Sequence, residues 1–163
     1  MKVNYDYYDS KDKYSDGEIE KEIIEYAEKY KENQVDEVFK NDIRWPVFYH
    51  LTPIRKNILN WYPFEKESTI LEIGAGMGAI TGAICEKGKE VVSVELSKTR
   101  AKAIEVRNRD KDNLEIIVAN LNNIDFKDKK FDYITLIGVY EYAALYTNTE
   151  NPYIDFLNNI KKL

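Results

Sequence analysis

Three glycines that alternate with other residues, Gly74, Gly76 and Gly78, are the part of the sequence with the clearest chemical meaning. They follow an apolar run at residues 70–73 and precede a helical pattern that begins near residue 79. Glycines at such a junction allow a tight turn and let a ligand lie against the bare main chain, facing the N–H groups at the start of a helix. A strand, a glycine loop and a helix in this order predict the first unit of a nucleotide-binding α/β sheet.

Glu72 lies at the end of the predicted strand, two residues before the first glycine. Gly74, Gly76 and Ala79 by themselves fit the fingerprint of dinucleotide-binding domains, so the spacing alone is ambiguous. A carboxylate at position 72 favours a positively charged ligand, because it would repel a pyrophosphate. With Gly78 the pattern extends to E-x-G-x-G-x-G.

This pattern resembles motif I of the class I S-adenosylmethionine-dependent methyltransferases. The resemblance implies S-adenosylmethionine as the cofactor. It also implies that the following residues contact it: Glu72, Gly74, Ala75, Gly76 and Gly78.

Later segments continue the resemblance in the expected order. Residues 90–95 are predicted to form a second buried strand that ends at Glu95, whose carboxylate can accept hydrogen bonds from both hydroxyls of a ribose. In the resembled family an Asp after the third strand commonly accepts a bond from the adenine amino group. Asn120 stands at this position, and its amide oxygen can accept the same bond. The other predicted cofactor contacts are Leu96, Leu121 and Gly138.

The predicted fold class is α/β, with a mostly parallel Rossmann-like sheet and helices on both faces. For the four strands that the sequence pattern indicates, the resemblance implies the order 3-2-1-4. Residues 63–163 form the predicted cofactor-binding domain. Residues 16–62 are predicted to be helical, with one long amphipathic helix reaching about residue 40, and residues 1–15 to be a disordered tail. The helices before the sheet either lie over the cofactor and help to form the substrate pocket, or only cover one face of the sheet.

The resembled family has further strands for which this sequence shows no pattern. The chain is therefore predicted to be truncated after its fourth strand, as a fragment of a longer protein. That strand would then present an unpaired edge and an uncovered apolar face. We therefore expect self-association through this edge or through the final helix.

Residues 138–143, just beyond the fourth strand, are where methyl-transfer chemistry is expected. Transfer from a sulfonium is an in-line displacement, so orientation and exclusion of water are the main contributions of an enzyme. A general base is needed only when the acceptor must lose a proton. The predicted catalytic residues are Glu141, as a possible base, and Tyr140. His50 is the only histidine and is predicted to be structural, and no cluster of residues has the spacing of a metal site.

The loop after the fourth strand also bears on the acceptor. Ribosomal-RNA adenine dimethyltransferases have a similar glycine motif but carry a proline-containing loop at residues 137–142, where this chain has none. Residues 50–55, 94–97 and 136–142 together resemble methyltransferase domains associated with bacterial surface-polysaccharide glycosyltransferases. A small-molecule or sugar-type acceptor is therefore predicted, and nucleic acid is not. The alternatives are a non-catalytic module that binds S-adenosylmethionine and an NAD-dependent oxidoreductase.

Composition is consistent with a cytoplasmic enzyme. The chain has 163 residues, 44% of them hydrophobic, which suffices for one domain with a core. The single cysteine, Cys85, excludes an internal disulfide and is expected in the core. No apolar run is long enough to cross a membrane, and the N-terminus lacks the apolar segment of a signal peptide. The net charge of −5 argues against a large nucleic-acid footprint.

Overall fold

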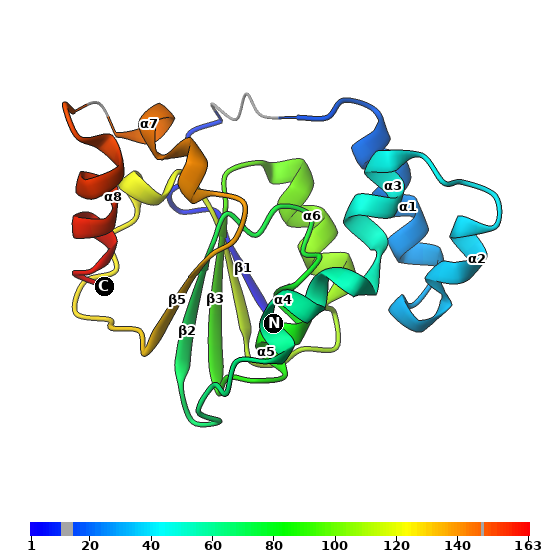
Figure 1. Ribbon diagram of the computed structural model, residues 1–163, viewed down its shortest axis with the longest axis horizontal. Coiled ribbons are helices and arrows are strands. Elements are labelled where there is room, and N and C mark those ends of the chain that lie inside the picture. The colour runs from blue at the N-terminus through cyan, green and yellow to red at the C-terminus, as the bar shows by residue number, and fades with distance from the viewer. Residues whose placement is uncertain (11–14, 148) are drawn as a thin grey trace.

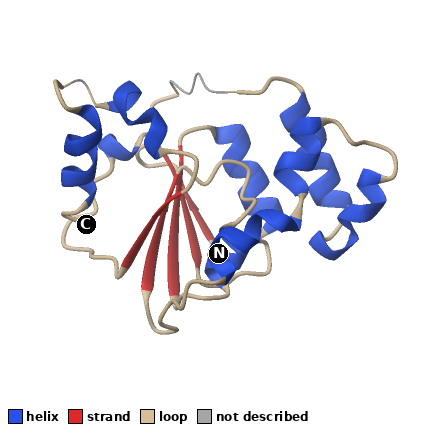
Figure 2. Ribbon diagram, viewed as in Figure 1, coloured by secondary structure: helices blue, strands red, loops and turns tan. Residues whose placement is uncertain are grey.

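The computed structural model describes residues 1–10, 15–147 and 149–163. Its centre is a sheet of five parallel strands in the order β1-β4-β3-β2-β5 (Figures 1 and 2). The strands are β1 (Lys2–Asn4), β2 (Thr69–Ile73), β3 (Glu90–Glu95), β4 (Leu114–Val118) and β5 (Tyr133–Leu136). The order β4-β3-β2-β5 is the predicted order 3-2-1-4, and the α/β Rossmann-like fold class is confirmed.

Alternate residues of the strands serve the two faces of the sheet, as a period of two requires. Ile70 and Val91 point to the face covered by α5 (Thr81–Cys85) and α6 (Lys98–Arg107). Leu71 and Val92 point to the opposite face, where they pack with residues of α7 (Ala143–Tyr146) and α8 (Pro152–Ile160). The sheet is therefore covered by helices on both faces, as predicted.

The helices that precede β2 are α1 (Ile19–Lys29), η1 (Glu32–Gln34), α2 (Val35–Phe39), α3 (Trp45–Leu51), η2 (Pro53–Lys56) and α4 (Asn57–Asn60). Leu59 of α4 packs in the cluster under the sheet, whereas three of the other helices, α1, α2 and α3, form a third apolar cluster. Ile23, Val38 and Val47 are buried in this cluster together with Met77 of the glycine loop and Ala103 of α6. α1, α2 and α3, at the right of Figure 1, thus pack on the glycine loop and on α6.

The N-terminal segment differs from its prediction as a disordered tail. Residues 2–4 form β1, which pairs with β4 in parallel register from Lys2 opposite Glu115 to Asn4 opposite Ile117. Hydrophobic periodicity cannot reveal a three-residue strand. It is stabilised by main-chain bonds to the free edge of β4, by packing of Val3 in the core and by an ion pair from Lys2 to Glu115 at 2.8 Å. Residues 11–14 of the predicted tail lie outside the described residues.

The long helix predicted to reach residue 40 is two helices. α1 ends at Lys29, and Tyr30 has an extended backbone with φ −119° and ψ 134°. This break turns the chain back, so that Val35 and Val38 of α2 join Ile23 of α1 in one cluster. The apolar spacing on which the prediction rested came from packing of separate helices on each other.

The edge strand β5 is as predicted, but the sheet face beside it is not bare. Phe156 and Ile160 of α8 are buried against that face. The main-chain N–H of Phe131, just before β5, also donates to the carbonyl oxygen of Leu163 at 2.9 Å. Self-association through this edge stays a prediction.

No helix in the described part of the chain combines the length and the apolar character that crossing a membrane requires. The cytoplasmic location stays a prediction.

Candidate functional site

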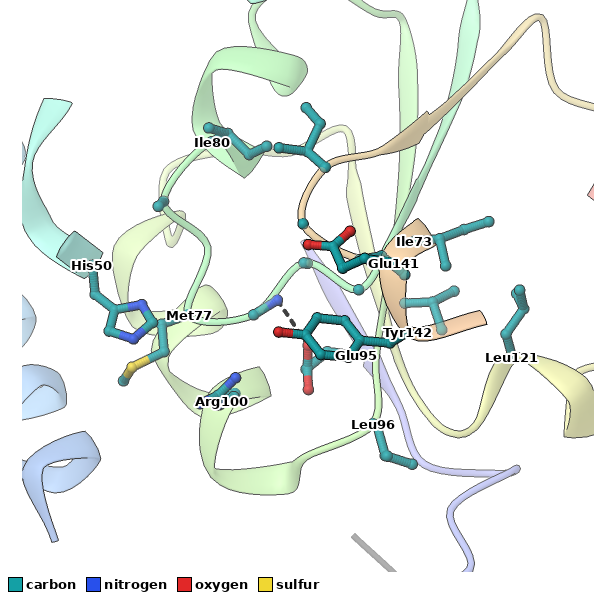
Figure 3. A pocket seen from close by; sticks show the side chains of 18 of the residues that line it. His50, Ile73, Met77, Ile80, Glu95, Leu96, Arg100, Leu121, Glu141 and Tyr142 are labelled. Carbon is teal, nitrogen blue, oxygen red and sulfur yellow. Dashed lines mark hydrogen bonds between the residues drawn. The ribbon is translucent and has the colours of Figure 1, made fainter. Parts of the chain in front are cut away.

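A pocket of about 460 Å³ opens at the carboxyl ends of the strands, next to the glycine loop (Figure 3). In an open parallel sheet, ligands bind at this edge. Of the predicted cofactor contacts, the residues that line the pocket are Gly74, Ala75, Gly76, Glu95, Leu96, Asn120, Leu121 and Gly138. Glu72 and Gly78 do not line it.

Glu95 lies at the end of β3 and holds the glycine loop in place. Its Oε2 accepts a hydrogen bond from the main-chain N–H of Gly76 at 2.7 Å, drawn in Figure 3, and its Oε1 accepts one from Ser97 at 2.8 Å. The residue is only 6% exposed. Burial raises the pKa of the Glu95 carboxyl to about 7, although the main-chain donors oppose this shift.

The main-chain N–H groups at the start of the glycine loop already donate hydrogen bonds within the protein. The N–H groups of Gly74 and Ala75 both donate to the carbonyl oxygen of Val94, at 2.8 and 3.1 Å. Gly76 has φ 58°, and a Cβ there would meet nothing within 4 Å, so the loop has an open surface at this residue. The loop therefore offers the pocket bare main chain, with the N–H groups of Gly74, Ala75 and Gly76 already bonded.

Gly78 faces the protein interior. Its φ is 73°, and a Cβ at this position would lie 3.1 Å from the Cα of Ile104 in α6. The glycine thus allows α6 to approach the loop closely, which is a packing role. The sequence pattern could not distinguish this role from contact with a ligand.

Glu72 also lies away from the pocket, which corrects its predicted position. It is 2% exposed, and its Oε2 accepts hydrogen bonds from Thr81 Oγ1 at 2.8 Å and from Ser93 Oγ at 2.6 Å. Strand alternation directs its side chain to the face under α5, opposite Ser93 in the register of β2 and β3. Among the described residues, its Oε1 is the only buried side-chain nitrogen or oxygen atom that has no hydrogen-bond partner. Burial raises the pKa of Glu72.

Beyond β4, Asn120 lines the pocket, and its side-chain oxygen accepts a hydrogen bond from the N–H of Asn122 at 3.0 Å. Asn120 thereby caps η3 (Leu121–Asn123). A carbonyl oxygen has two lone pairs, so one remains for a ligand.

The loop after β5 supplies the far wall of the pocket from η4 (Tyr140–Tyr142). Glu141 and Tyr142 line the pocket and are labelled in Figure 3. Tyr140, the other predicted catalytic residue, does not line it. Its ring packs on Tyr153 at 5.6 Å, and its hydroxyl donates to the carbonyl oxygen of Tyr153 at 3.3 Å. Tyr140 is thus a packing residue, because the turn of η4 directs it toward α8.

A family model described as a methyltransferase domain matches residues 71–159, more than half of the chain. The chain belongs to this methyltransferase family. The predicted resemblance to S-adenosylmethionine-dependent methyltransferases is confirmed at the level of the family.

Two sequence relatives and one solved structure illustrate this membership. Ribosomal RNA small subunit methyltransferase A of Mycoplasma mycoides is 32% identical over 89 residues, which are 55% of this chain and 30% of that protein. The protein of the same name from Clostridium botulinum is 29% identical over 75 residues, 46% of this chain and 27% of the relative. The alignments therefore span less than a third of these curated relatives.

The solved structure is that of an S-adenosylmethionine-dependent methyltransferase from Thiobacillus denitrificans, crystallised with S-adenosyl-L-homocysteine. It superposes on this methyltransferase with a TM-score of 0.51 at 18% identity, over 66% of this chain and 43% of that one. At this identity the likeness shows the shared fold.

These relatives correct one prediction. Their names assign them to ribosomal RNA, so the prediction that excluded nucleic acid as a partner is wrong. It rested on the net charge and on the missing proline loop. A net charge summed over a chain does not describe the potential at one pocket, and a single base can be recognised by stacking without a broad basic face. The surface-polysaccharide link stays a prediction.

The N-terminal helices of this methyltransferase contribute a wall of the pocket that the sequence did not identify residue by residue. Trp45, Tyr49, His50 and Arg55 line it. Of the two roles left open for these helices, the structure therefore favours a part in the pocket. The sequence signal that could have pointed to them is the density of aromatic residues at 45–50.

His50, predicted to be structural, is 6% exposed, and its Nε2 lies 3.4 Å from Asp16 Oδ2. Burial lowers the pKa of His50 to about 4, so the imidazole is neutral at pH 7. Among the described residues, no group of three His, Cys, Asp or Glu side chains could hold a metal ion.

The raised pKa of Glu95 predicts a pH-dependent stability. The folded state binds a proton on the Glu95 carboxyl more tightly than the unfolded state does. The resulting contribution to the free energy of unfolding is complete below about pH 4.5 and is lost as the pH rises through about 7. A shift of this size corresponds to about 3 kcal/mol. His50 acts in the opposite direction, because its lowered pKa makes the folded state more stable as the pH rises from about 4 to 6.5.

The difference between the Glu95→Gln variant and the unmodified chain isolates the effect of Glu95, since both carry His50. We expect urea unfolding to show the variant gaining about 3 kcal/mol relative to the unmodified chain between pH 4.5 and pH 8. A difference that stays constant with pH would mean that Glu95 titrates normally in the folded protein.

Proposed function

We propose that this methyltransferase binds S-adenosylmethionine in the pocket and transfers the methyl group to an acceptor that enters beside α3 and η4. The observation that carries the cofactor assignment is the bonding of the glycine loop. The N–H groups of Gly74, Ala75 and Gly76 already donate to Val94 and Glu95. A dinucleotide would need free N–H groups there for its pyrophosphate, whereas a nucleoside with a positively charged sulfur needs none.

The residues of the pocket suit the three parts of this cofactor. The Glu95 carboxylate keeps lone pairs beyond its two main-chain bonds, and these accept the ribose hydroxyls. Asn120 accepts from the adenine amino group, with Leu96 and Leu121 beside the ring. Bare main chain at Gly76 leaves room for the amino-acid part.

When bound, the cofactor supplies a methyl group on a positively charged sulfur. The chain itself contributes position and exclusion of water, and these are the main requirements of an in-line displacement. The apolar residues Ile73, Ile80 and Val139 line the pocket and keep that part of it dry.

Two classes of acceptor suit the part of the pocket wall formed by α3 and η4. A sugar or other small molecule with a hydroxyl group would need a base, and Glu141 is the carboxylate of η4 that lines the pocket. A nucleobase, the kind of acceptor suggested by the names of the relatives, would stack on the exposed rings of Trp45 and Tyr142. Incorporation of labelled methyl into ribosomal RNA or into a panel of sugars distinguishes these acceptors.

Calorimetric titration with S-adenosyl-L-homocysteine, run beside NAD, tests the cofactor assignment. We expect micromolar binding of S-adenosyl-L-homocysteine and no heat with NAD. Binding of NAD alone would favour the alternative that the protein is an NAD-dependent oxidoreductase. Binding of S-adenosyl-L-homocysteine by a chain that methylates no acceptor would favour the non-catalytic module.

A further inference from the structure

Arg55 is a positively charged residue of the pocket that the proposed function leaves without a role. It lies on η2, is half-buried and lines the pocket. Its guanidinium carbon lies 4.1 Å from the centroid of the Tyr49 ring. Stacking of this kind orients a guanidinium plane while leaving its N–H donors at the edge free for an anion.

The guanidinium of Arg55 makes no hydrogen bond or ion pair with any residue that the structure describes. The other arginine of the pocket differs in this respect, because Arg100 donates to Glu20 and Asp16, each at 2.7 Å. Arg107, behind the loop, donates to two carbonyl oxygens. A guanidinium that lines a pocket with five N–H donors and no described acceptor is suited to an anionic ligand.

Arg55 belongs to the wall of the pocket that lies nearest Met77 of the glycine loop. It stacks on the residue next to His50, and Arg107 donates to the carbonyl oxygens of both His50 and Met77. The charge of Arg55 also lowers the pKa of Glu72, the residue just before the loop, against the larger effect of burial. In the proposed function, Asn120 and Glu95, at the ends of β4 and β3, hold the adenine and the ribose.

We propose that Arg55 binds the carboxylate of the amino-acid part of the cofactor. The inference rests on the proposed function, in which Asn120 and Glu95 hold the nucleoside, so that the amino-acid part is left for the open main chain at Gly76 and for Arg55. A planar guanidinium meets a carboxylate through two parallel N–H···O bonds. Arg55 therefore fixes the end of the cofactor opposite the adenine, with Tyr49 holding the guanidinium in position.

Two ligands that share the adenosine part separate this role from a general one. S-Adenosyl-L-homocysteine carries the carboxylate, whereas methylthioadenosine has the same nucleoside and sulfur without the amino acid. We expect Arg55→Gln to weaken binding of S-adenosyl-L-homocysteine by about 10- to 100-fold and to leave that of methylthioadenosine within about twofold. Arg55→Lys keeps the charge but loses the planar pair of donors, so its affinity is expected to lie between the two.

Lys56→Gln is the matched control. It removes one positive charge from the same short helix, but Lys56 does not line this pocket and pairs with Glu32. Both ligands should bind this variant as they bind the unmodified chain. Circular dichroism of each variant reports that the fold is retained.

Each other outcome is informative. Unchanged affinity of Arg55→Gln for S-adenosyl-L-homocysteine would overturn the inference and direct Arg55 to an anionic group of the acceptor. Equal weakening of both ligands would also overturn it, because Arg55 would then act on the shape of the whole pocket. Failure of the unmodified chain to bind S-adenosyl-L-homocysteine would overturn the proposed function itself.

Discussion

Replacing Glu95 with alanine is expected to weaken binding of S-adenosyl-L-homocysteine by about a hundredfold or more. At pH 8, above the Glu95 pKa of about 7, the variant deprives two ribose hydroxyls of a charged acceptor, and a hydrogen bond to a charged group contributes about 1.5–3 kcal/mol. The variant also frees the N–H of Gly76, which Glu95 holds at 2.7 Å, so the glycine loop loses a main-chain constraint. Calorimetric titration of the variant and the unmodified chain measures the change.

Two further variants make this result interpretable. Glu95→Gln keeps one acceptor oxygen and should retain part of the affinity. Glu90→Ala removes the same charge from the opposite end of β3, where Glu90 is exposed, and should leave the affinity unchanged. If Glu95→Ala bound as tightly as Glu90→Ala, Glu95 would not be a ribose ligand.

Replacing Arg100 with alanine is expected to destabilise the fold by about 3–5 kcal/mol. Arg100 is 7% exposed, and its Nε donates to Glu20, which is 1% exposed, at 2.7 Å. Its Nη2 donates to Asp16 at 2.7 Å. The variant leaves the Glu20 carboxylate buried without a cation, at the contact between α1 and α6. Urea unfolding at pH 7 measures the loss.

The double variant Arg100→Met with Glu20→Leu tests the cause. Replacing both charges by apolar groups removes the uncompensated carboxylate, so most of the stability should return. Arg44→Ala is the comparison at the surface, since Arg44 is half exposed and pairs with Glu22 and Asp42. It should cost about 1 kcal/mol or less. If Arg100→Ala and Arg44→Ala lowered the free energy of unfolding by similar amounts, burial of the Arg100 ion pair would not explain the loss of stability.

The part of the site that could be predicted lies at the ends of β2, β3 and β4. A glycine loop is a local signal, because the positive φ angles of Gly74 and Gly76 are demanded by a turn of few residues. Parallel strands align their carboxyl ends by construction, so Glu95 and Asn120 could be placed on one edge from their positions in the sequence alone.

Glu72 and Tyr140 show where that reasoning failed. Both lie next to pocket residues in the sequence, yet Glu72 bonds to Thr81 and Ser93 in the interior and Tyr140 packs on Tyr153. A shift of one residue in a strand changes the face to which a side chain points. Motif position alone does not resolve this.

The sequence by itself determined the parallel sheet and the methyltransferase family, because these depend on hydrophobic periodicity and on short motifs, and the resemblance to that family gave the order of the four longer strands. The tertiary structure alone decided three features: the pairing of β1 with β4, the stacking of Arg55 on Tyr49 in the wall of the pocket, and the bond of Arg100 to Glu20. The first and the third of these features join elements that are distant in the sequence, so the spacing of neighbouring residues does not predict their contact. Arg100 and Glu20 are 80 residues apart in the chain, and only the packing of α1 on α6 brings them together.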